Sequence, residues 1–512
     1  MMFFKVNDYA QKFVRKVIKM VVGRDEIDSY LRKYKLDEVL YQLAEVSQAM
    51  LREAKAIRQV KWNRRVGGLA ETKTLHMPAF ALADIAYRAI KHSNDHRQKI
   101  PNYQDICWFS NLLAKATDVR AVEENQNRDI EKSKRDIFLG LSQTQFWYQD
   151  IVSHQKKLYY NFLRYYLLLT EIANEFTLVN PDEDLRAITG FGIEDFSKLL
   201  FAIYAWIRTE NKPELTPGVM TIDRTLTDSN PILTQENILR CAEFFTGDYQ
   251  YYRQTGYPNN PLFFKPIVRT QSGRLIIANA FVWCRKFYEG VYWLLRDKYF
   301  QEDSTDFTTA FGEYYEKYVE KMLDYYLEPG SFRRIEEEGR ADWLIYTDKY
   351  LIIVEQKSSL MSIALKKKYP SGEQFDEYLK ILKKGCHQLN ETENYIDAEG
   401  RTKIKIILTF EKLYFIDAYV KPKIDELYSS EIASLERCYF ADTEDFEQLI
   451  QVIPDDIDAF NKIIETKIEY ENNPPAPAEG RDLKDVISKV YGWRIVRFLE
   501  DYRHLFHNLV QT

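Results

Sequence analysis

Hydrophobic positions recur every three to four residues through most of the first part of the chain. The clearest stretches are residues 28–57, 79–92 and 148–176, and this spacing is typical of amphipathic helices. The first strong break comes at residues 212–218, which contain two prolines and one glycine. We therefore expect residues 1–212 to form a helical domain that binds substrate, senses a trigger or mediates assembly.

The pattern changes to shorter apolar runs after residue 213. Residues 264–269 and 274–278 are strand-like and flank the turn residues 270–273, which predicts a β-hairpin. A helix is expected from about residue 281 to residue 299. Residues 213–304 are thus predicted to be a mixed α/β region that connects the helical domain to the rest of the chain.

The pattern in residues 305–470 predicts a mixed sheet flanked by helices. An amphipathic helix comes first, a second helical stretch divides the strand-like runs, and a closing helix follows them. The expected helices are residues 311–323 and 373–390, and the expected strands are residues 331–335, 340–346, 350–357, 403–410, 412–420 and 437–440. The chain as a whole is therefore predicted to have an α+β fold, with a helical N-terminal region followed by this sheet.

The end of the chain is predicted to be a linker followed by a helix. Residues 471–482 include a run rich in Asn, Pro and Ala, which is typical of a linker. Residues 483–512 carry an amphipathic pattern, so we expect a C-terminal helix that docks back on the protein or meets a partner.

The predicted central hairpin places charged groups beside apolar positions. If a two-residue turn closes it, residue i pairs with residue 697 − i, so Asp342 lies opposite Glu355. Lys357 shares a face with Glu355 because side chains alternate along a strand. Residues 351–354 are apolar on both faces, which predicts a covered central strand beside which an unpaired charge is costly.

This group of side chains favours metal-dependent phosphodiester hydrolysis. Mg²⁺ and Mn²⁺ prefer oxygen ligands, so Asp342, Glu355 and the backbone carbonyl of Gln356 are the predicted metal ligands. A bound ion lowers the pKa of a water molecule, and Lys357 would orient that water or stabilise the transition state. The alternative is that the three side chains form a plain cross-strand ion pair on a solvated face.

These residues, with the helix before them, resemble the PD-(D/E)XK nuclease superfamily, which has the restriction-endonuclease-like fold. The shared features are the Gly-x-x-Tyr-Glu run from Gly312 to Glu316, Asp342 in a hydrophobic strand, and the pair Glu355-x-Lys357. The resemblance implies that Asp342 and Glu355 bind the metal and that Lys357 is the catalytic lysine. It also implies that Glu316 adds a carboxylate to the site.

A further part of the resemblance lies in the predicted helix after the hairpin. Gln374 and Tyr378 resemble the Gln-x-x-x-Tyr element of the RecB-like branch, and Gln388 is a rival for that glutamine. The chain departs from the family pattern at Ala341, where the pattern has proline. The resemblance covers about residues 305–450 and no other part of the chain.

Two basic stretches are candidate nucleic-acid contacts, because Lys and Arg neutralise phosphates. One follows the Glu-x-Lys strand, and the other is the densest basic run of the chain, which we expect on a helix face. The residues concerned are Lys366, Lys367 and Lys368 in the first stretch, and Arg58, Lys61, Arg64 and Arg65 in the second. The alternative for each is a solvated surface with no ligand.

Composition narrows the possible functions. The net charge of −6 argues against a general binder of polyanions, although residues 1–75 carry 16 Lys and Arg against 9 Asp and Glu. The five cysteines form no Cys-x-x-Cys pair, which favours reduced thiols in a cytoplasmic protein. We recognise neither a signal peptide nor a membrane-spanning run, so no membrane partner is expected.

The sequence therefore predicts a Mg²⁺- or Mn²⁺-dependent nuclease that hydrolyses nucleic-acid phosphodiester bonds, with DNA favoured over RNA. The helical region is the predicted site of contact with a protein partner or a second copy of the chain. A role in bacterial defence or restriction is a hypothesis from analogy alone. The alternative is a non-catalytic nucleic-acid-binding or assembly subunit that retains a nuclease-like fold.

Overall fold

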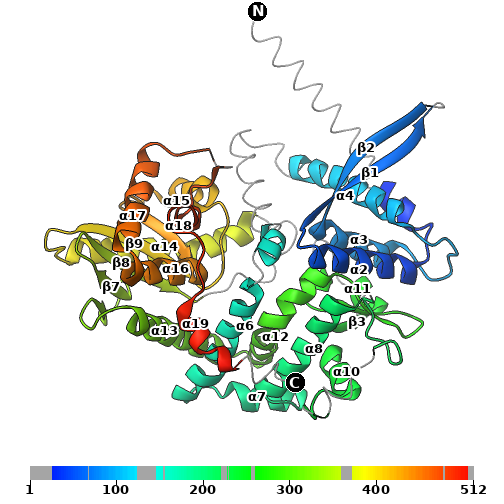
Figure 1. Ribbon diagram of the computed structural model, residues 1–512, viewed down its shortest axis with the longest axis horizontal. Coiled ribbons are helices and arrows are strands. Elements are labelled where there is room, and N and C mark those ends of the chain that lie inside the picture. Colours follow the sequence, from blue (N-terminus) through cyan, green and yellow to red (C-terminus); the bar gives the residue numbers. More distant parts are fainter. Residues whose placement is uncertain are drawn as a thin grey trace, which may run out of the picture.

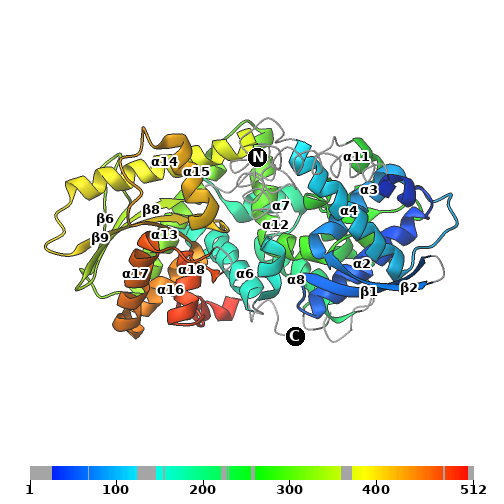
Figure 2. The same ribbon diagram turned by 90° about the horizontal axis from the view of Figure 1, so that it is seen from above.

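The computed structural model shows two lobes joined by a central group of helices (Figure 1), and the same division is visible from above (Figure 2). The structure describes residues 26–66, 69–123, 146–153, 156–210, 212–220, 228, 230–254, 260–358, 372–476 and 479–505. Of residues 62–66, 69–73, 114–123 and 372–376 only the backbone is described.

The helical lobe, residues 26–301, is built mainly of helices, as the apolar spacing predicts. These are α2 (Leu36–Arg52), α3 (Ala79–His92), α4 (Tyr103–Glu123), α6 (Lys157–Leu167), α7 (Pro181–Thr189), α8 (Ile193–Thr209), α10 (Gln235–Glu243), α11 (Tyr249–Gln254) and α12 (Ala280–Gln301), with the short helical segments η1 (Leu168–Ile172), η2 (Ala173–Glu175) and η3 (Pro261–Phe263). Helix α12 packs against α2, α6, α7 and α8 and also against the first helix of the other lobe. It therefore joins the two lobes.

Two small sheets belong to the helical lobe. Strands β1 (Ile57–Val66) and β2 (Leu69–Pro78) pair antiparallel, while β3 (Thr246–Asp248) runs parallel to β4 (Ile267–Arg269), which pairs antiparallel with β5 (Leu275–Ile277). The pairing of β4 with β5 confirms the hairpin that the sequence predicts there.

The sheet lobe, residues 306–505, contains one five-stranded sheet flanked by helices. Its elements are α13 (Asp306–Tyr326), β6 (Phe332–Arg334), β7 (Trp343–Tyr346), β8 (Tyr350–Lys357), α14 (Gly372–Tyr395), β9 (Thr402–Thr409), η4 (Ile416–Val420), α15 (Lys421–Tyr428), β10 (Cys438–Asp442), α16 (Thr443–Asp455), α17 (Ile457–Asn472), α18 (Leu483–Val490) and α19 (Arg497–Asp501). The strand order is β10-β9-β8-β7-β6. Strands β6, β7 and β8 are antiparallel neighbours, whereas β8, β9 and β10 run parallel.

Both faces of this sheet are covered by hydrophobic cores. Ile352 and Val354 of β8 belong to the core that continues into the helical lobe, whereas Leu351 and Ile353 pack with α14 and α15. All four side chains are fully buried. Strand β8 is therefore the covered central strand that its apolar run predicts, and the α+β fold class is confirmed.

The predicted helix over residues 28–57 is wrong at two points: a turn at residues 32–35 interrupts it, and it ends early. Helix α2 ends at Arg52, and the chain then turns through Ala54, whose φ is 52°. In the following hairpin exposed and buried residues alternate: Thr74 and His76 are exposed, and Leu75 and Met77 are buried. This period of two is that of a strand, so the basic run at residues 58–65 does not form a helix face.

The predicted strand over residues 412–420 is also wrong. Leu413, Ile416, Val420 and Ile424 are buried in the core beside α14. Ile416, Val420 and Ile424 are four positions apart, which places them on one side of a helical segment that the structure forms as η4 and α15, whereas Leu413 precedes it. The prediction assumed the period of two of a strand, whereas the segment has the period of a helix.

The C-terminal segment docks back on the sheet lobe, but it is not one helix. Asp482, at the end of the predicted linker, caps α18 and accepts hydrogen bonds from the backbone N–H groups of Ile416 and Asp417 at 3.0 and 2.9 Å. Gly492 has a φ of 79°, a left-handed conformation that ends the helical run before α19 begins. Within the described part of the chain, every helix is too short or too polar to cross a bilayer.

Candidate active site

The central hairpin has the register predicted from the sequence. Trp343 of β7 pairs with Val354 of β8, and the same relation between residue numbers holds from this pair to the turn. The backbone N–H of Asp342 donates to the carbonyl of Val354 at 3.0 Å, one position out of this register, so the paired ladder ends at Trp343 and Val354. Asp342 and Glu355 follow this last pair on the two strands, and the negative charge of Asp342 acts on Glu355.

Asp342 is fixed by the backbone of β8. Its Oδ2 atom accepts a hydrogen bond from the backbone N–H of Gln356 at 2.6 Å. The Gln356 side chain accepts from the indole Nε1–H of Trp343 at 3.2 Å, so it is engaged away from the carboxylates. Burial raises the pKa of Asp342, and the Gln356 N–H and the charge of Lys357 offset only part of this effect.

Glu355 and Lys357 lie side by side under α14. Lys357 Nζ donates to Glu355 Oε1 and also to Gln388 Oε1, the latter at 3.0 Å, and Gln388 Nε2 donates to the carbonyl of Arg340 at 3.0 Å. Glu355 is 1% exposed, and its Oε2 atom has no hydrogen-bond partner among the described residues. Burial and the neighbouring Asp342 raise the pKa of Glu355 to about 8, despite the charge of Lys357.

A glycine on α14 allows the helix to approach these two side chains closely. A Cβ atom at Gly385 would lie 3.2 Å from Lys357 Cε and 3.3 Å from Glu355 Cγ. Because α14 covers the pair at this distance, the aliphatic parts of both side chains are packed and their rotamers are restricted. The geometry of the charged groups is thus fixed by the helix as well as by the strand.

Glu316 of α13 borders the same group. It forms an ion pair with Arg334 of β6, the edge strand. Burial raises the pKa of Glu316; Arg334 opposes this effect, and the nearby negative charge of Asp342 adds to it. The four predicted site residues Asp342, Glu355, Lys357 and Glu316 therefore influence one another electrostatically, with Arg334 as an additional cation that the sequence analysis did not identify.

Asp342 and Glu355 offer carboxylate oxygens to a divalent cation. No three His, Cys, Asp or Glu side chains in the described ranges are arranged to hold a metal ion by themselves. Mg²⁺ needs only one or two carboxylates, since it keeps several water ligands. A divalent cation next to Asp342 and Glu355 would satisfy the unpartnered Oε2 atom and remove the cost of two buried negative charges. These residues therefore fit Mg²⁺ or Mn²⁺.

Most of the predicted nucleic-acid contacts are not placed by the structure. Lys366, Lys367 and Lys368 lie outside the described residues, as do the side chains of Gln374, Arg64 and Arg65. Arg58 is engaged by Glu53 at 2.7 Å and lies 5.5 Å from the ring centre of Tyr103, while Lys61 is exposed. The predicted contact at Tyr378 is corrected: this residue of α14 is 4% exposed in the core between the helix and the sheet, so its ring packs in the fold.

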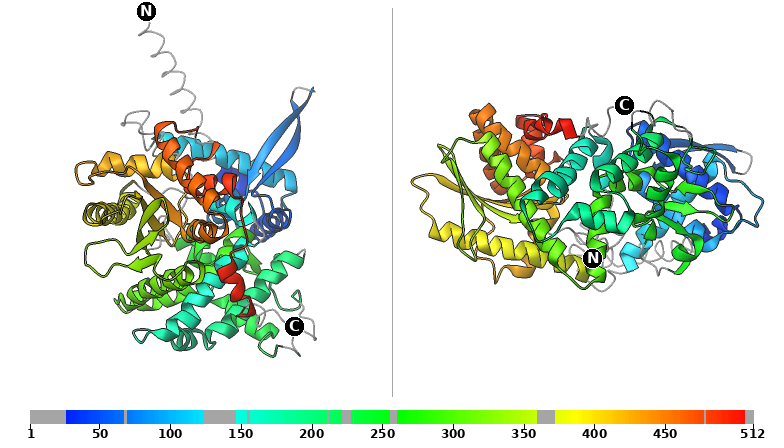
Figure 3. Two further views of the ribbon diagram at one scale, coloured as in Figure 1. Left: turned by 60° about the vertical axis from the view of Figure 1, so that its left-hand side comes forward. Right: turned by 90° about the horizontal axis from the view of Figure 1, so that it is seen from below.

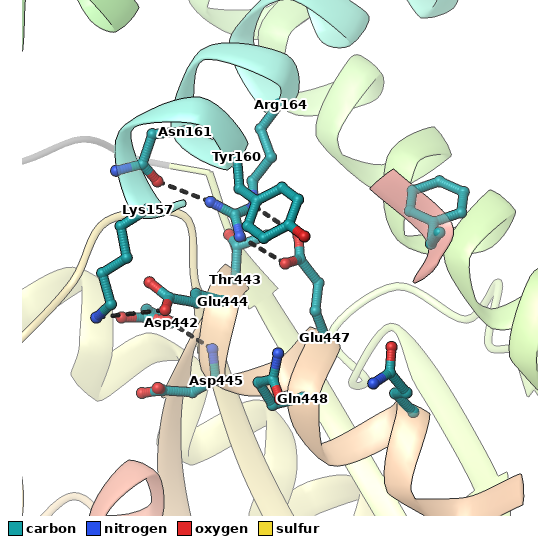
Figure 4. Close-up of polar contacts among 12 residues, drawn as sticks. Lys157, Tyr160, Asn161, Arg164, Asp442, Thr443, Glu444, Asp445, Glu447 and Gln448 are labelled. Atoms are coloured by element: carbon teal, nitrogen blue, oxygen red, sulfur yellow. Dashed lines mark hydrogen bonds and ion pairs between the residues drawn. The ribbon is translucent and has the colours of Figure 1, made fainter. Parts of the chain in front are cut away.

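Sequence analysis missed a second group of buried charges, at the ends of β9 and β10 where the lobes meet (Figure 4). This inter-lobe cluster consists of Asp150, Lys157, Arg164, Lys412, Asp442, Glu444 and Glu447. Arg164 of α6 binds Glu447 of α16 through Nε and a terminal nitrogen at 2.6 and 2.5 Å, and the two residues are 4% and 0% exposed. Tyr318 of α13 also donates to Glu447, so three helices meet at this carboxylate.

The remaining charges of the inter-lobe cluster are also paired. Lys412 Nζ lies 3.3 Å from Asp150 and 3.5 Å from Asp442, and Lys157 Nζ lies 3.3 Å from Glu444. Burial acts to raise the pKa of Asp150 and of Glu444, but Lys412 and Lys157 outweigh it and hold both pKa values below their usual range. The one sequence signal for this cluster was the acidic run at residues 442–447.

Comparisons with known proteins add no assignment. A scan against protein-family models, a search of curated proteins and a search of solved structures each find no match to this chain. We therefore infer the function from the residues of the site and from their geometry.

Proposed function

We propose that this protein is a divalent-metal-dependent nuclease whose active site contains Asp342, Glu355 and Lys357. The observation that carries the proposal is the buried Glu355, which has one unpartnered carboxylate oxygen beside the half-buried carboxylate of Asp342. Two ionised carboxylates and one lysine leave a net negative charge, which one divalent cation offsets. A plain ion pair on a solvated face does not account for a glutamate that is 1% exposed.

The order of elements supports the resemblance to PD-(D/E)XK nucleases. In the sheet lobe a helix precedes three antiparallel strands, and a second helix leads to two further strands parallel to the central one. Asp342 precedes the second strand of this series, and Glu355 and Lys357 lie at the C-terminal end of the third. These positions agree with the ones that the resemblance implies for the metal ligands and the catalytic lysine.

The proposed ligands of Mg²⁺ or Mn²⁺ are Asp342, Glu355 and the backbone carbonyl of Gln356, with Glu316 as an outer carboxylate. When bound, the ion supplies a water of lowered pKa and neutralises charge on the scissile phosphate. The unpartnered Oε2 atom of Glu355 is the position at which a ligand is most clearly needed.

Lys357 provides a fixed positive charge beside the reacting groups. Its Nζ is held by Glu355 and by Gln388, so it reaches the scissile phosphate without a costly search through rotamers. In this position it stabilises the negative charge that develops on the phosphate oxygens and orients the attacking water. Gln388 acts as a positioning residue, since it binds both Lys357 and the carbonyl of Arg340.

Cleavage of linear and supercoiled DNA with Mg²⁺ tests this proposal. We expect Lys357→Ala and Asp342→Ala to lose about 100-fold or more in rate, the range in which a positioned catalytic group contributes. Lys349→Ala is the matched control, because Lys349 lies in the turn at the opposite end of the same hairpin with 58% of its side chain exposed. Cleavage by the site variants at the wild-type rate would remove the assignment.

A second candidate function is a non-catalytic nucleic-acid-binding or assembly subunit with a nuclease-like fold. This charge pattern is not needed for such a role, because an apolar hairpin of the same shape avoids the cost of burying Glu355. Retained DNA binding without cleavage by any form of the protein, with Mg²⁺ or with Mn²⁺, is the result that favours this alternative.

A further inference from the structure

The hairpin of β1 and β2 extends away from the helices around it, as two different views show (Figures 1 and 3). Its strands are ten residues each, from Ile57 to Val66 and from Leu69 to Pro78, and every residue of β1 has a partner on β2. At a rise of roughly 3.3 Å per residue, paired strands of this length reach about 33 Å. The hairpin is therefore a two-stranded ribbon of a size that a macromolecular surface can accommodate.

One face of this ribbon attaches it to the helical lobe. Leu75 and Met77 are 7% and 0% exposed, and β2 packs against α4. Arg58, the register partner of Met77, is held by Glu53 and lies over the ring of Tyr103. The orientation of the opposite face is fixed by these contacts.

The opposite face is exposed, and beyond the exposed Ile57, which pairs with Pro78, it carries polar side chains. Gln59, Lys61, Thr74 and His76 are all exposed, and they form the register pairs Gln59 with His76 and Lys61 with Thr74. The next two pairs of the same alternating series are Asn63 with Thr72 and Arg65 with Ala70. None of these positions is occupied by Asp or Glu, although the chain as a whole carries 77 Asp and Glu against 71 Lys and Arg.

We propose that this face of the β1–β2 hairpin binds duplex DNA, with Lys61 on a phosphate and Gln59, Thr74 and His76 as hydrogen-bonding groups. The absence of carboxylates removes the repulsion that would oppose a phosphate backbone, and the lysine supplies an attractive charge. Gln, Thr and His offer donors and acceptors to base edges and sugars. The identity of the ligand depends on the proposed nuclease function, whereas the location of the surface does not.

The shape of the ribbon favours DNA over duplex RNA. The major groove of B-form DNA is about 12 Å wide and admits a two-stranded β-ribbon. The major groove of A-form RNA is too narrow and deep for side chains to read. A two-stranded ribbon that presents polar side chains therefore fits the DNA groove, and we expect the RNA duplex of the same sequence to bind more weakly.

The test measures binding by fluorescence anisotropy with a labelled DNA duplex, at several salt concentrations, in full-length protein that carries Lys357→Ala to prevent cleavage. We expect Lys61→Glu to weaken binding about tenfold and to lower the slope of log K against log salt by about 1, as for loss of one phosphate contact. Thr74→Glu introduces a negative charge at the partner position and should also weaken binding several-fold. Circular dichroism and thermal melting identify any variant that fails to fold, and the other variant then decides.

Lys349→Glu is the matched control, because it makes the same charge reversal at an exposed lysine in a hairpin of the other lobe. Its dissociation constant should stay within about twofold of the parent, since screening limits the effect of distant charges. Unchanged binding by Lys61→Glu and Thr74→Glu overturns the proposal, and so does an equal loss with Lys349→Glu. The proposal is also overturned if Lys61→Glu and Thr74→Glu lose as much affinity for duplex RNA as for duplex DNA.

This experiment separates the fate of the surface from that of the proposed nuclease activity. If the hairpin variants lose DNA binding while the wild type cleaves no DNA with Mg²⁺ or Mn²⁺, the surface stands and the nuclease proposal falls. If the wild type cleaves DNA and the hairpin variants bind it unchanged, the nuclease proposal stands and the surface falls.

Discussion

Two groups of charged side chains lie at the same end of the five-stranded sheet, and they differ in how their charges are paired. Lys357 on β8 is in register with Thr409 on β9, which is in register with Asp442 on β10, so both groups are at the C-terminal ends of parallel strands. In the proposed active site the pKa values of Asp342 and Glu355 are raised. In the inter-lobe cluster those of Asp150 and Glu444 are lowered by the neighbouring lysines. Burial raises the pKa of Glu447, by contrast, and Arg164 and Tyr318 offset only part of this effect.

The difference separates a structural role from a functional one. In the inter-lobe cluster Lys157, Arg164 and Lys412 are paired with carboxylates, and the pairs connect α6 of one lobe to α16 of the other. In the proposed active site Lys357 binds Glu355 and Arg334 pairs with Glu316, while the Oε2 atom of Glu355 has no hydrogen-bond partner among the described residues. Burial is thus common to both groups, and the unpartnered carboxylate oxygen is the feature from which we infer a ligand site.

The largest expected effect is the loss of the inter-lobe pair. Glu447→Ala leaves the Arg164 guanidinium buried without its partner, and we expect about 3–5 kcal/mol less stability toward chemical denaturation. Glu320→Ala on α13 is the control, because the pair of Glu320 with Lys317 is 38% and 33% exposed and should change stability by less than about 1 kcal/mol. If both variants lose the same stability, the inter-lobe pair has no special role.

A change of opposite sign is expected in the active site. Glu355→Gln removes the buried, partly unsatisfied charge, so the metal-free protein should gain about 1–3 kcal/mol of stability at pH 8. The same variant should lose DNA cleavage. Denaturation in the presence of a chelator measures the first effect, and a decrease in stability would show that Glu355 is a structural residue like Glu447.

The two groups should also give the stability profile two limbs of opposite slope. The pKa of Glu355 is raised to about 8, so the folded state holds a proton that the unfolded chain releases above about 4.5, and stability without metal falls as pH rises through this range. The pKa of Glu444 is lowered, so its contribution is present above the unfolded pKa and is lost as pH falls below it.

Denaturation between pH 3 and pH 9 in the presence of a chelator measures both limbs. Glu355→Gln should flatten the limb above pH 5, and Glu444→Gln should weaken the limb below it. A profile that both substitutions leave unchanged would contradict the comparison.

The smallest expected effect concerns the cation that borders the active site. Arg334 pairs with Glu316, and its positive charge acts on Asp342, so Arg334→Ala should lower the Mg²⁺ concentration for half-maximal cleavage by a few-fold. Arg333→Ala is the neighbouring control, because Arg333 donates to Tyr346 at 3.1 Å and not to a carboxylate of the site. Calorimetric titration with Mn²⁺ gives a second measure, and identical responses of the two variants would remove Arg334 from the site.

Local patterns were sufficient where the apolar period was unambiguous. The predicted helices near residues 79–92, 281–299 and 373–390 correspond to α3, α12 and α14, and the register of the central hairpin from Trp343 to Val354 follows from a two-residue turn. They failed at residues 57–66 and 412–420, where short apolar runs fit either period. In these segments burial against distant elements decided between strand and helix.

The sequence by itself determined which charged side chains the hairpin brings together. Residue type and a period of two are enough to place Asp342, Glu355 and Lys357 near one another at one end of the hairpin. It did not determine which buried charges are neutralised. That depended on Lys157 and Arg164, which lie more than 250 positions before Glu444 and Glu447 in the chain. Only tertiary structure brings such groups within range, since electrostatic interaction depends on distance in space and on burial, and neither can be read from spacing along the chain.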